Sequence, residues 1–143
     1  MTRILVLNGP NLDRLGIRQP EVYGSTTLAQ IEAHLRARAS ELGLDLTVVQ
    51  SNREDDLLRA IGAGADGIII NPAAFTHFSY ALADGLGAAS APVIEVHLSN
   101  IHSREPFRRL SVVSPVARGV ICGLGPDGYG YALEALARIL SES

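Results

Sequence analysis

Five short apolar runs, separated by longer segments with helical spacing, constrain what this chain can fold into more than any other feature. Residues 4–7 and 67–70 are continuous apolar runs, as expected for strands that are covered on both faces. Because strands and helices alternate along the chain, the pattern indicates a parallel sheet wrapped by helices. The remaining predicted strands are residues 44–49, 92–96 and 119–122.

Capping signals place helices between these strands. Thr27 and Gln30 have the spacing of a capping box, and Ser51 and Glu54 repeat that spacing at the start of a second helix. We therefore predict a flavodoxin-like three-layer α/β/α sandwich with a five-stranded parallel sheet, in a single domain over residues 1–143. The predicted helices are residues 27–42, 51–64, 78–86 and 127–141.

Charge and composition indicate the cellular compartment and the classes of binding partner that we expect. The formal net charge of -3 is spread along the chain without a basic block, which argues against nucleic acid and membrane surfaces as partners. The first apolar run is too short for a signal peptide, and no stretch approaches the roughly 20 apolar residues of a membrane helix. Cys122 is the single cysteine, so no internal disulfide can form. We expect a soluble cytoplasmic protein.

Lysine is missing from the sequence, because all twelve basic residues are arginines. Schiff-base catalysis, attachment of pyridoxal phosphate and phosphate binding by a P-loop all need a lysine, so the sequence excludes them. A catalytic metal is disfavoured, because His97 and His102 lack the spacing of a helical metal pair and no cysteine pair exists. We expect neither a metal nor another cofactor.

Polar residues follow the predicted strands at their carboxyl ends, where open α/β sheets bind ligands. The long segment after the first strand holds Arg18 and Tyr23. A nearby arginine favours the phenolate form of a tyrosine and makes it a usable base. The plainer interpretation is a tyrosine that packs this loop down, and these residues alone do not decide between the two.

The strongest polar cluster begins on the strand at residues 92–96. Glu95 and His97 lie two apart on a strand, so they share one face. A carboxylate beside an imidazole stabilises the protonated ring and fixes its tautomer, which suits a general acid. Arg104 and Arg108 follow, and arginine suits carboxylates and hydroxyls. The alternative is a surface ion-pair network.

Asn71 and His77 follow the strand at residues 67–70, where they could hydrogen-bond the hydroxyl groups of a ligand. The alternative is that this segment is only the first turn of a helix, with Thr76 as its cap.

Two rival functions belong to other classes. A flavodoxin-like regulator that binds a small ligand or a nucleotide without catalysis would want a Ser/Thr-rich loop after the first strand, or a cluster of acids with a lysine. A serine hydrolase would want a Gly-x-Ser-x-Gly turn, which this sequence lacks.

Taken in order, these clusters resemble those of type II 3-dehydroquinate dehydratases. The likeness runs from the first strand to the last helix, and the motifs together are far more specific than any one of them. The matching segments are Asn8-Gly9-Pro10-Asn11-Leu12, Arg14-Leu15-Gly16, Tyr23-Gly24, residues 71–77, residues 91–100 and Gly119-Val120-Ile121.

The resemblance implies a role for each matching residue. Tyr23 would be the base, with Arg18 beside it, and Asn11 would hold a water that stabilises an enolate. His97 would be the general acid, supported by Glu95. Arg104 would support the lid and pair with an acid of a neighbouring subunit. The residues implied in substrate binding are Asn71, His77, Asp84 (that neighbouring acid), Leu98, Ser99 and Arg108.

The reaction that the resemblance implies is the elimination of water from 3-dehydroquinate to give 3-dehydroshikimate, a step of the shikimate pathway of aromatic amino acid biosynthesis. It proceeds through an enolate and forms no imine, in keeping with the missing lysine. A lid loop at about residues 14–25 would close over the substrate and would be mobile when empty. The resemblance also implies a homo-dodecamer, built as a tetramer of trimers.

Overall fold

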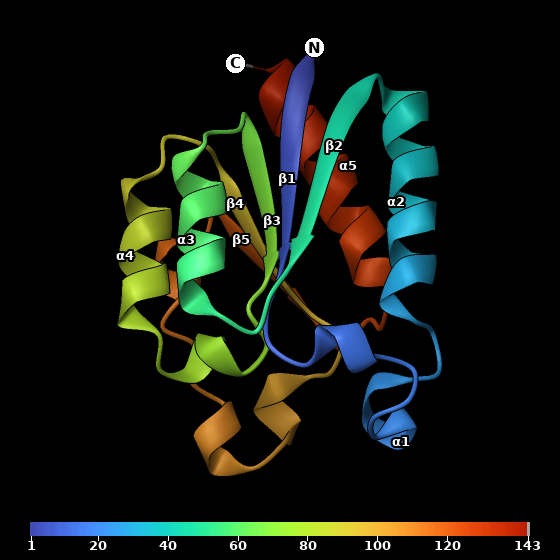
Figure 1. The fold of residues 1–143 in the computed structure, drawn as a ribbon, viewed down its shortest axis with the longest axis vertical. Coiled ribbons are helices and arrows are strands. Elements are labelled where there is room, and N and C mark those ends of the chain that lie inside the picture. The colour runs from blue at the N-terminus through green and yellow to red at the C-terminus, as the bar shows by residue number, and fades with distance from the viewer. Residues whose placement is uncertain (143) are drawn as a thin grey trace.

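The chain folds around one parallel sheet of five strands (Figure 1). The computed structural model describes residues 1–142, apart from the side chain of Tyr23. The strand order is β2-β1-β3-β4-β5, which confirms the predicted five-stranded flavodoxin-like sheet. The strands are β1 (Thr2–Asn8), β2 (Leu44–Gln50), β3 (Gly67–Asn71), β4 (Val93–His97) and β5 (Gly119–Cys122).

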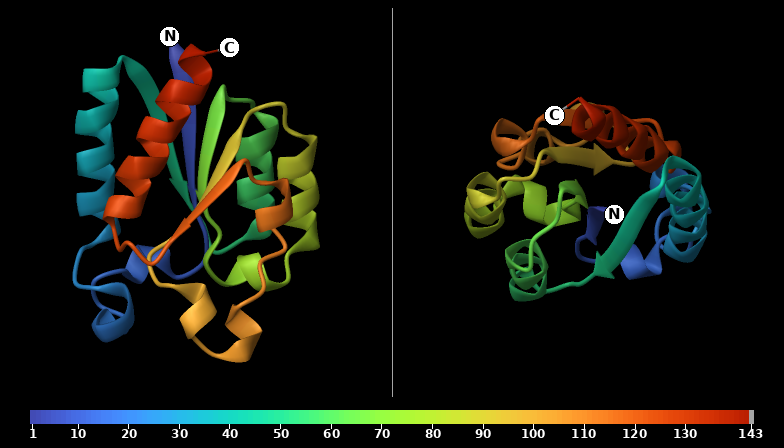
Figure 2. Two further views of the ribbon diagram at one scale, coloured as in Figure 1. Left: turned by 180° about the vertical axis from the view of Figure 1, so that it is seen from behind. Right: turned by 90° about the horizontal axis from the view of Figure 1, so that it is seen from above.

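Two helical layers cover the sheet and complete the predicted sandwich (Figure 2). Side chains alternate between the two layers along each strand, so that Ile4 of β1 enters one core and Leu5 enters the other. The strand sequences are continuously apolar because both faces are buried. One layer contains α2 (Leu28–Leu42) and α5 (Asp127–Ser141), and the other contains α3 (Glu54–Gly62) and α4 (Tyr80–Ala88).

One of the two predicted capping boxes is present. Thr27 Oγ1 accepts from the Gln30 backbone N–H at 3.2 Å, and Gln30 Oε1 accepts from the Thr27 backbone N–H at 2.9 Å. The box predicted at Ser51 and Glu54 is wrong. Helix α3 begins at Glu54, and Ser51 Oγ donates to the side chain of Asp56 at 2.6 Å instead.

The start of α4 also differs from the sequence prediction. Ser79, rather than Thr76, caps this helix, and its hydroxyl accepts from the Leu82 backbone N–H at 3.1 Å. The same hydroxyl donates to Glu54 and so ties the starts of α3 and α4 together. Thr76 instead donates to the buried carboxylate of Glu95.

The segments between the long helices and the strands contain short helices, and all of them except η5 gather at the carboxyl end of the sheet, opposite the chain termini (Figure 1). The exception, η5, packs against α4. Among the described residues, no helix is long and apolar enough to cross a membrane. The short helices are η1 (Leu12–Arg14), α1 (Pro20–Tyr23), η2 (Ala73–His77), η3 (Ile101–Ser103), η4 (Pro106–Arg108) and η5 (Ser114–Val116).

The chain turns to opposite sides of the sheet after the neighbouring strands β1 and β3, which makes this a topological switch point. The two segments touch here, because the Gly9 backbone N–H donates to the Asn71 carbonyl at 2.8 Å. A Cβ on Gly9 would lie only 2.3 Å from the Pro72 carbonyl oxygen. Only glycine allows this approach, which sets the spacing of the ligand-binding end.

Replacing Gly9 with alanine should force these two segments apart. We expect Gly9→Ala to lower the free energy of unfolding by about 1–3 kcal/mol, the usual cost of overpacking. Gly130→Ala is the matched control, because Gly130 lies inside α5 with open space around its missing Cβ. Urea unfolding should show that control unchanged or stabilised by up to about 1 kcal/mol. Equal stability of the two variants would contradict the close approach.

Candidate active site

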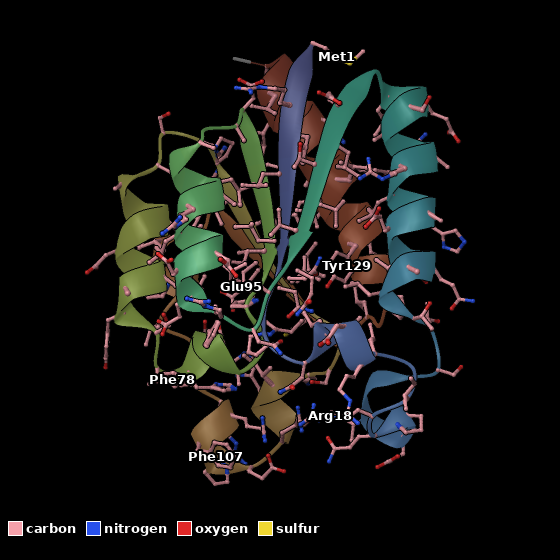
Figure 3. All side chains as sticks on the ribbon, viewed as in Figure 1. Met1, Arg18, Phe78, Glu95, Phe107 and Tyr129 are labelled. Atoms are coloured by element: carbon pink, nitrogen blue, oxygen red, sulfur yellow. The ribbon has the colours of Figure 1, made fainter. Side chains whose placement is uncertain are left out.

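A pocket lies at the carboxyl ends of β1, β3 and β4. Its outer part is formed by the segments that carry η1, α1, η3 and η4. Figure 3 places Arg18 and Phe107 beyond the lower end of the sheet, and Glu95 within the height of the sheet. The structure brings nine residues of the predicted site to its wall. They are Asn11, Arg18, Asn71, His77, His97, Leu98, Ser99, Arg104 and Arg108.

Three predicted residues stand apart from this wall. Glu95 lies behind His97 and is completely buried. Asp84 is exposed on α4 and does not line the pocket of its own chain. Tyr23 is the last residue of α1, and its side chain lies outside the described part of the structure.

Asn11 is held in a left-handed backbone conformation, with φ of 69°. Its backbone N–H donates to Asn52 Oδ1 at 2.9 Å, and Gln50 Nε2 donates to the same oxygen at 3.1 Å. Gln50 Nε2 also donates to the Gly9 carbonyl at 3.1 Å. The end of β2 therefore fixes the turn that carries Asn11, although it contributes no side chain to the pocket wall. Asparagine tolerates this conformation better than most residues do.

Glu95 is a fully buried carboxylate surrounded by hydrogen-bond donors. Its Oε2 accepts from Thr76 Oγ1 at 3.0 Å, from Ser111 Oγ at 2.9 Å and from the Nε2 of His97. Its Oε1 accepts from Ser114 Oγ at 2.6 Å. Burial alone would raise the pKa of Glu95, but the hydrogen bonds from His97, Ser114 and Ser111 outweigh burial and hold the pKa below its usual value.

An ionised Glu95 determines how His97 is oriented and protonated. A carboxylate without a proton can only accept, so His97 Nε2 carries the hydrogen of their bond. The other ring nitrogen, Nδ1, is then the one left for a ligand, and the ring is nearly buried at the base of the pocket. His97 can therefore hold a second proton on Nδ1 and release it to a bound molecule.

His77 also lines the pocket and has a defined orientation. Its Nδ1 lies 2.8 Å from the Leu110 carbonyl, which can only accept, so this nitrogen carries the hydrogen. Nε2 is then available as an acceptor toward a ligand. Arg108 is anchored nearby, since Nε donates to Glu105 at 2.5 Å and the guanidinium lies 4.7 Å from the ring centre of Phe107.

A buried chain of hydrogen bonds joins β1, β3 and α5 behind the pocket. Asn71 Nδ2 donates to Tyr129 Oη at 3.0 Å, and that hydroxyl donates to Asn8 Oδ1 at 2.7 Å. Asn71 Oδ1 accepts from the Ala73 backbone N–H at 3.1 Å. Burial raises the pKa of Tyr129 well above its usual value, so the hydroxyl keeps its proton. Tyr129 thereby fixes the amide of Asn71.

The sequence interpretation missed the groups that hold the site in place. Thr76, Ser111 and Ser114 are common polar residues with no local spacing that points to Glu95, and they converge on it only in the folded chain. Tyr129 looks like one more aromatic residue of the last helix. Asn52 alone had a signal, because it follows directly after a strand in the predicted ligand-binding edge.

The pocket wall is cationic. It carries the guanidinium groups of Arg18, Arg104 and Arg108, and none of its described residues is an aspartate or a glutamate. An anionic ligand with hydroxyl groups fits this wall, because arginine binds carboxylates well and the amide and imidazole groups bind hydroxyls. Among the described residues, no group of three His, Cys, Asp or Glu side chains could hold a metal ion.

Comparisons with known proteins agree with this geometry. The chain matches the family model of class II dehydroquinases over residues 2–137. A 3-dehydroquinate dehydratase of Edwardsiella ictaluri is 56% identical over 143 residues, covering 98% of this chain and 96% of the relative. A 3-dehydroquinate dehydratase of Vibrio cholerae is 57% identical over 142 residues, covering 97% of this chain and 95% of the relative.

Solved structures show the same fold. The type II dehydroquinase of Propionibacterium acnes is 49% identical and superposes with a TM-score of 0.93, over 96% of this chain and 97% of the other. A 3-dehydroquinate dehydratase-like protein of Bifidobacterium longum is 35% identical, with a TM-score of 0.74 over 99% of both chains.

Removing the hydroxyl of Tyr129 tests the buried hydrogen-bond chain. Tyr129→Phe leaves Asn8 Oδ1 without its donor, and Asn8 Nδ2 is already buried without a partner among the described residues. We expect a loss of about 1–3 kcal/mol in the free energy of unfolding, measured with urea. Tyr131→Phe is the matched control, because Tyr131 is exposed on the same helix. If the two variants are equally stable, the buried hydrogen bonds of Tyr129 do not contribute to stability.

Proposed function

The chain belongs to the class II dehydroquinase family, and we propose that its pocket eliminates water from 3-dehydroquinate to give 3-dehydroshikimate. It is a lyase of the shikimate pathway. The observation that carries the chemistry is the buried Glu95–His97 pair at the base of an arginine-lined pocket. A regulator that binds a ligand without catalysis is not favoured by this family assignment.

Substrate binding rests on groups of the pocket wall. We propose that the backbone N–H groups of Leu98 and Ser99 bind the substrate carboxylate. The turn that carries them is held by Gly125 N–H, which donates to the Leu98 carbonyl at 3.0 Å. Asn71, with its amide fixed, and His77, with Nε2 available, would bind ring hydroxyls.

Arg108 would bind the ring hydroxyls as well. Its guanidinium is held at the pocket wall by Glu105 and by the ring of Phe107, so little freedom is lost when a ligand binds.

The reaction begins with removal of a proton from C2 of the substrate, which is acidic because it lies beside the C3 ketone. Tyr23 as the phenolate takes this proton, and Arg18 favours the phenolate by its positive charge. Electron density moves to the C3 oxygen, and the resulting enolate is stabilised by a water that Asn11 orients. The fixed turn around Asn11 supports this role.

His97 completes the elimination by protonating the C1 hydroxyl as it departs. The proton comes from Nδ1, because Nε2 remains bonded to Glu95. The enolate collapses, the C1–C2 double bond forms, and water leaves. The cycle closes when Tyr23 loses its proton and His97 regains one, so that there is no net change in the enzyme.

We propose that residues 14–25 form a lid over this chemistry. Two glycines with positive φ, Gly16 and Gly24, lie near the two ends of the segment. A Cβ on Gly16 would lie 2.8 Å from the Ser25 carbonyl oxygen, so the two ends of the segment meet. A loop with close ends can swing as one body and carry Arg18 and Tyr23 together.

We propose that the chain forms a homo-oligomer, a dodecamer, and that it works in the cytoplasm. Exposed apolar side chains beside the pocket support the proposed assembly. Asp84 lies one helical turn after Tyr80 on α4, so the acid and this apolar surface share one face. We propose that Asp84 reaches Arg104 of a neighbouring subunit. The exposed side chains are Phe78 (56%), Tyr80 (71%), Phe107 (64%) and Leu110 (65%).

The proposed chemistry is tested by the absorbance of the conjugated enone product. Purified enzyme should convert 3-dehydroquinate and should keep its activity after borohydride treatment with substrate, because no imine forms. Tyr23→Phe and His97→Ala should each lose about 10²–10⁴-fold in kcat. His102→Ala is the control, because His102 is exposed outside the pocket. An inactive, correctly folded wild type would overturn the proposed function.

Mixing variants tests the role of Asp84 across subunits. Asp84→Ala and His97→Ala should each be poorly active alone, because each lacks one group of every site. Oligomers co-expressed from both should regain activity, since some sites receive Asp84 from one chain and His97 from the other. If Asp84 acted within its own chain, complementary sites would not form and the mixture would stay inactive.

A further inference from the structure

The hydroxyl groups around Glu95 are the feature of the molecule that the proposed mechanism leaves unexplained. Thr76 comes from η2, Ser114 from η5, and Ser111 from the segment between η4 and η5. Each of the three hydroxyls lies within 3.0 Å of the carboxylate of Glu95, which is completely buried, and Thr76 Oγ1 also lies 2.5 Å from Ser111 Oγ. An ionised carboxylate offers about four acceptor sites, and the three hydroxyls take those that His97 leaves open. Burying a charge is costly unless it is hydrogen-bonded, so these hydroxyls bear directly on the charge state of Glu95.

We infer that Thr76, Ser111 and Ser114 are positioning residues that keep Glu95 charged and aligned on His97, and so set the acidic limit of activity. This inference rests on the proposed function. None of the three lines the pocket, so they act through Glu95 rather than on the substrate.

The distribution of the donors over the two carboxylate oxygens supports this inference. Ser114 donates to Oε1, while Thr76 and Ser111 donate to Oε2, the oxygen that also accepts from His97. Both oxygens are thus hydrogen-bonded by neutral hydroxyl groups. Hydrogen bonds to the charged form stabilise it against burial.

Apart from His97, the surroundings of Glu95 leave these hydroxyls as the groups that control its charge. His97 is the titratable group that contacts it, and Ile70 and Val120 lie beside it on the neighbouring strands. On the same side of the sheet, the charged residues of α3 are exposed except for Glu54, which accepts from Ser79. Tyr80 and Asp84 of α4 are exposed, and His77 of η2 bonds to the Leu110 carbonyl instead.

The sign of the effect follows from the lowered pKa of Glu95. Removing a donor destabilises the carboxylate, so the pKa of Glu95 should rise. A protonated Glu95 no longer needs the hydrogen on His97 Nε2, and the aligned pair is lost. Activity should therefore fail at a higher pH than in the wild type, while the plateau at higher pH changes little.

The test compares pH profiles of kcat for Thr76→Val and Ser114→Ala with two controls. We expect the acidic limb of both variants to move to a pH about one unit higher. The reason is that the free energy of one hydrogen bond to a charged group corresponds to a pKa change of about one unit. At a given pH on the acidic limb, the activity of each variant would then be about tenfold lower than that of the wild type. Thr76→Ser keeps a hydroxyl and should restore the wild-type limb.

Ser79→Ala controls for a purely structural loss, because Ser79 is a buried hydroxyl that caps α4 and bonds to Glu54 instead of Glu95. It should lower stability and leave the acidic limb in place. An unmoved limb in Thr76→Val and Ser114→Ala would overturn the inference, even if the wild type is active and His97→Ala is not.

A second readout does not depend on activity. Because the folded pKa of Glu95 is lowered, its contribution to stability is present above the unfolded pKa and lost as pH falls through the folded pKa. Urea unfolding across the acidic range should show that Thr76→Val loses part of this pH dependence and Thr76→Ser does not. Identical pH dependence in the wild type and Thr76→Val would contradict the inference whatever reaction the enzyme catalyses.

Discussion

The ionised carboxylate of Glu95, buried behind the pocket, is the interaction on which the site depends. A charge in this position is tolerated only because hydrogen-bond donors surround it. Burying the charge without them would be costly, so the fold must bring these donors to Glu95. Once Glu95 is charged, Nε2 of His97 must carry a hydrogen, and Nδ1 becomes the nitrogen that can give a proton away. The chemistry of the pocket is thus fixed from behind, by residues that never meet the substrate.

The fold makes this arrangement possible by separating two tasks. The strands and the four long helices bury apolar side chains in two cores, while the carboxyl ends of the strands and the segments after them carry nearly all of the polar groups of the site. Parallel strands bring these segments to one end, and the contact between Gly9 and Pro72 at the switch point keeps two of them close. Tyr129 then links the ends of β1 and β3 to the last helix.

Much of this could be predicted from the sequence, for identifiable reasons. Continuous apolar runs report strands buried on both faces, so the five strands and the layer arrangement followed directly. Glu95 and His97 could be paired because alternate residues of a strand share a face. The predicted start of α3 was wrong. The spacing of Ser51 and Glu54 fits a capping box, but in the folded chain Ser51 bonds to Asp56 and Glu54 bonds to Ser79.

The groups that hold the site could not be predicted in the same way. Thr76, Ser111 and Ser114 come from three separate segments, and Thr76 was assigned instead to a possible helix cap that Ser79 provides. Such contacts depend on the packing of distant segments and leave no periodic trace along the chain. The partner that we propose for Asp84 is Arg104 of a neighbouring subunit, so no periodicity within one chain brings these two residues together.

The most direct test is the protonation of the His97 ring, observed by nitrogen-15 NMR and assigned by the signals that disappear in His97→Ala. We predict that Nε2 keeps its hydrogen and that only Nδ1 exchanges a proton. In Glu95→Gln the amide can meet either tautomer, and this preference should weaken. A wild-type ring that carries its single hydrogen on Nδ1 would contradict the claim that Glu95 directs the proton of His97 to the substrate.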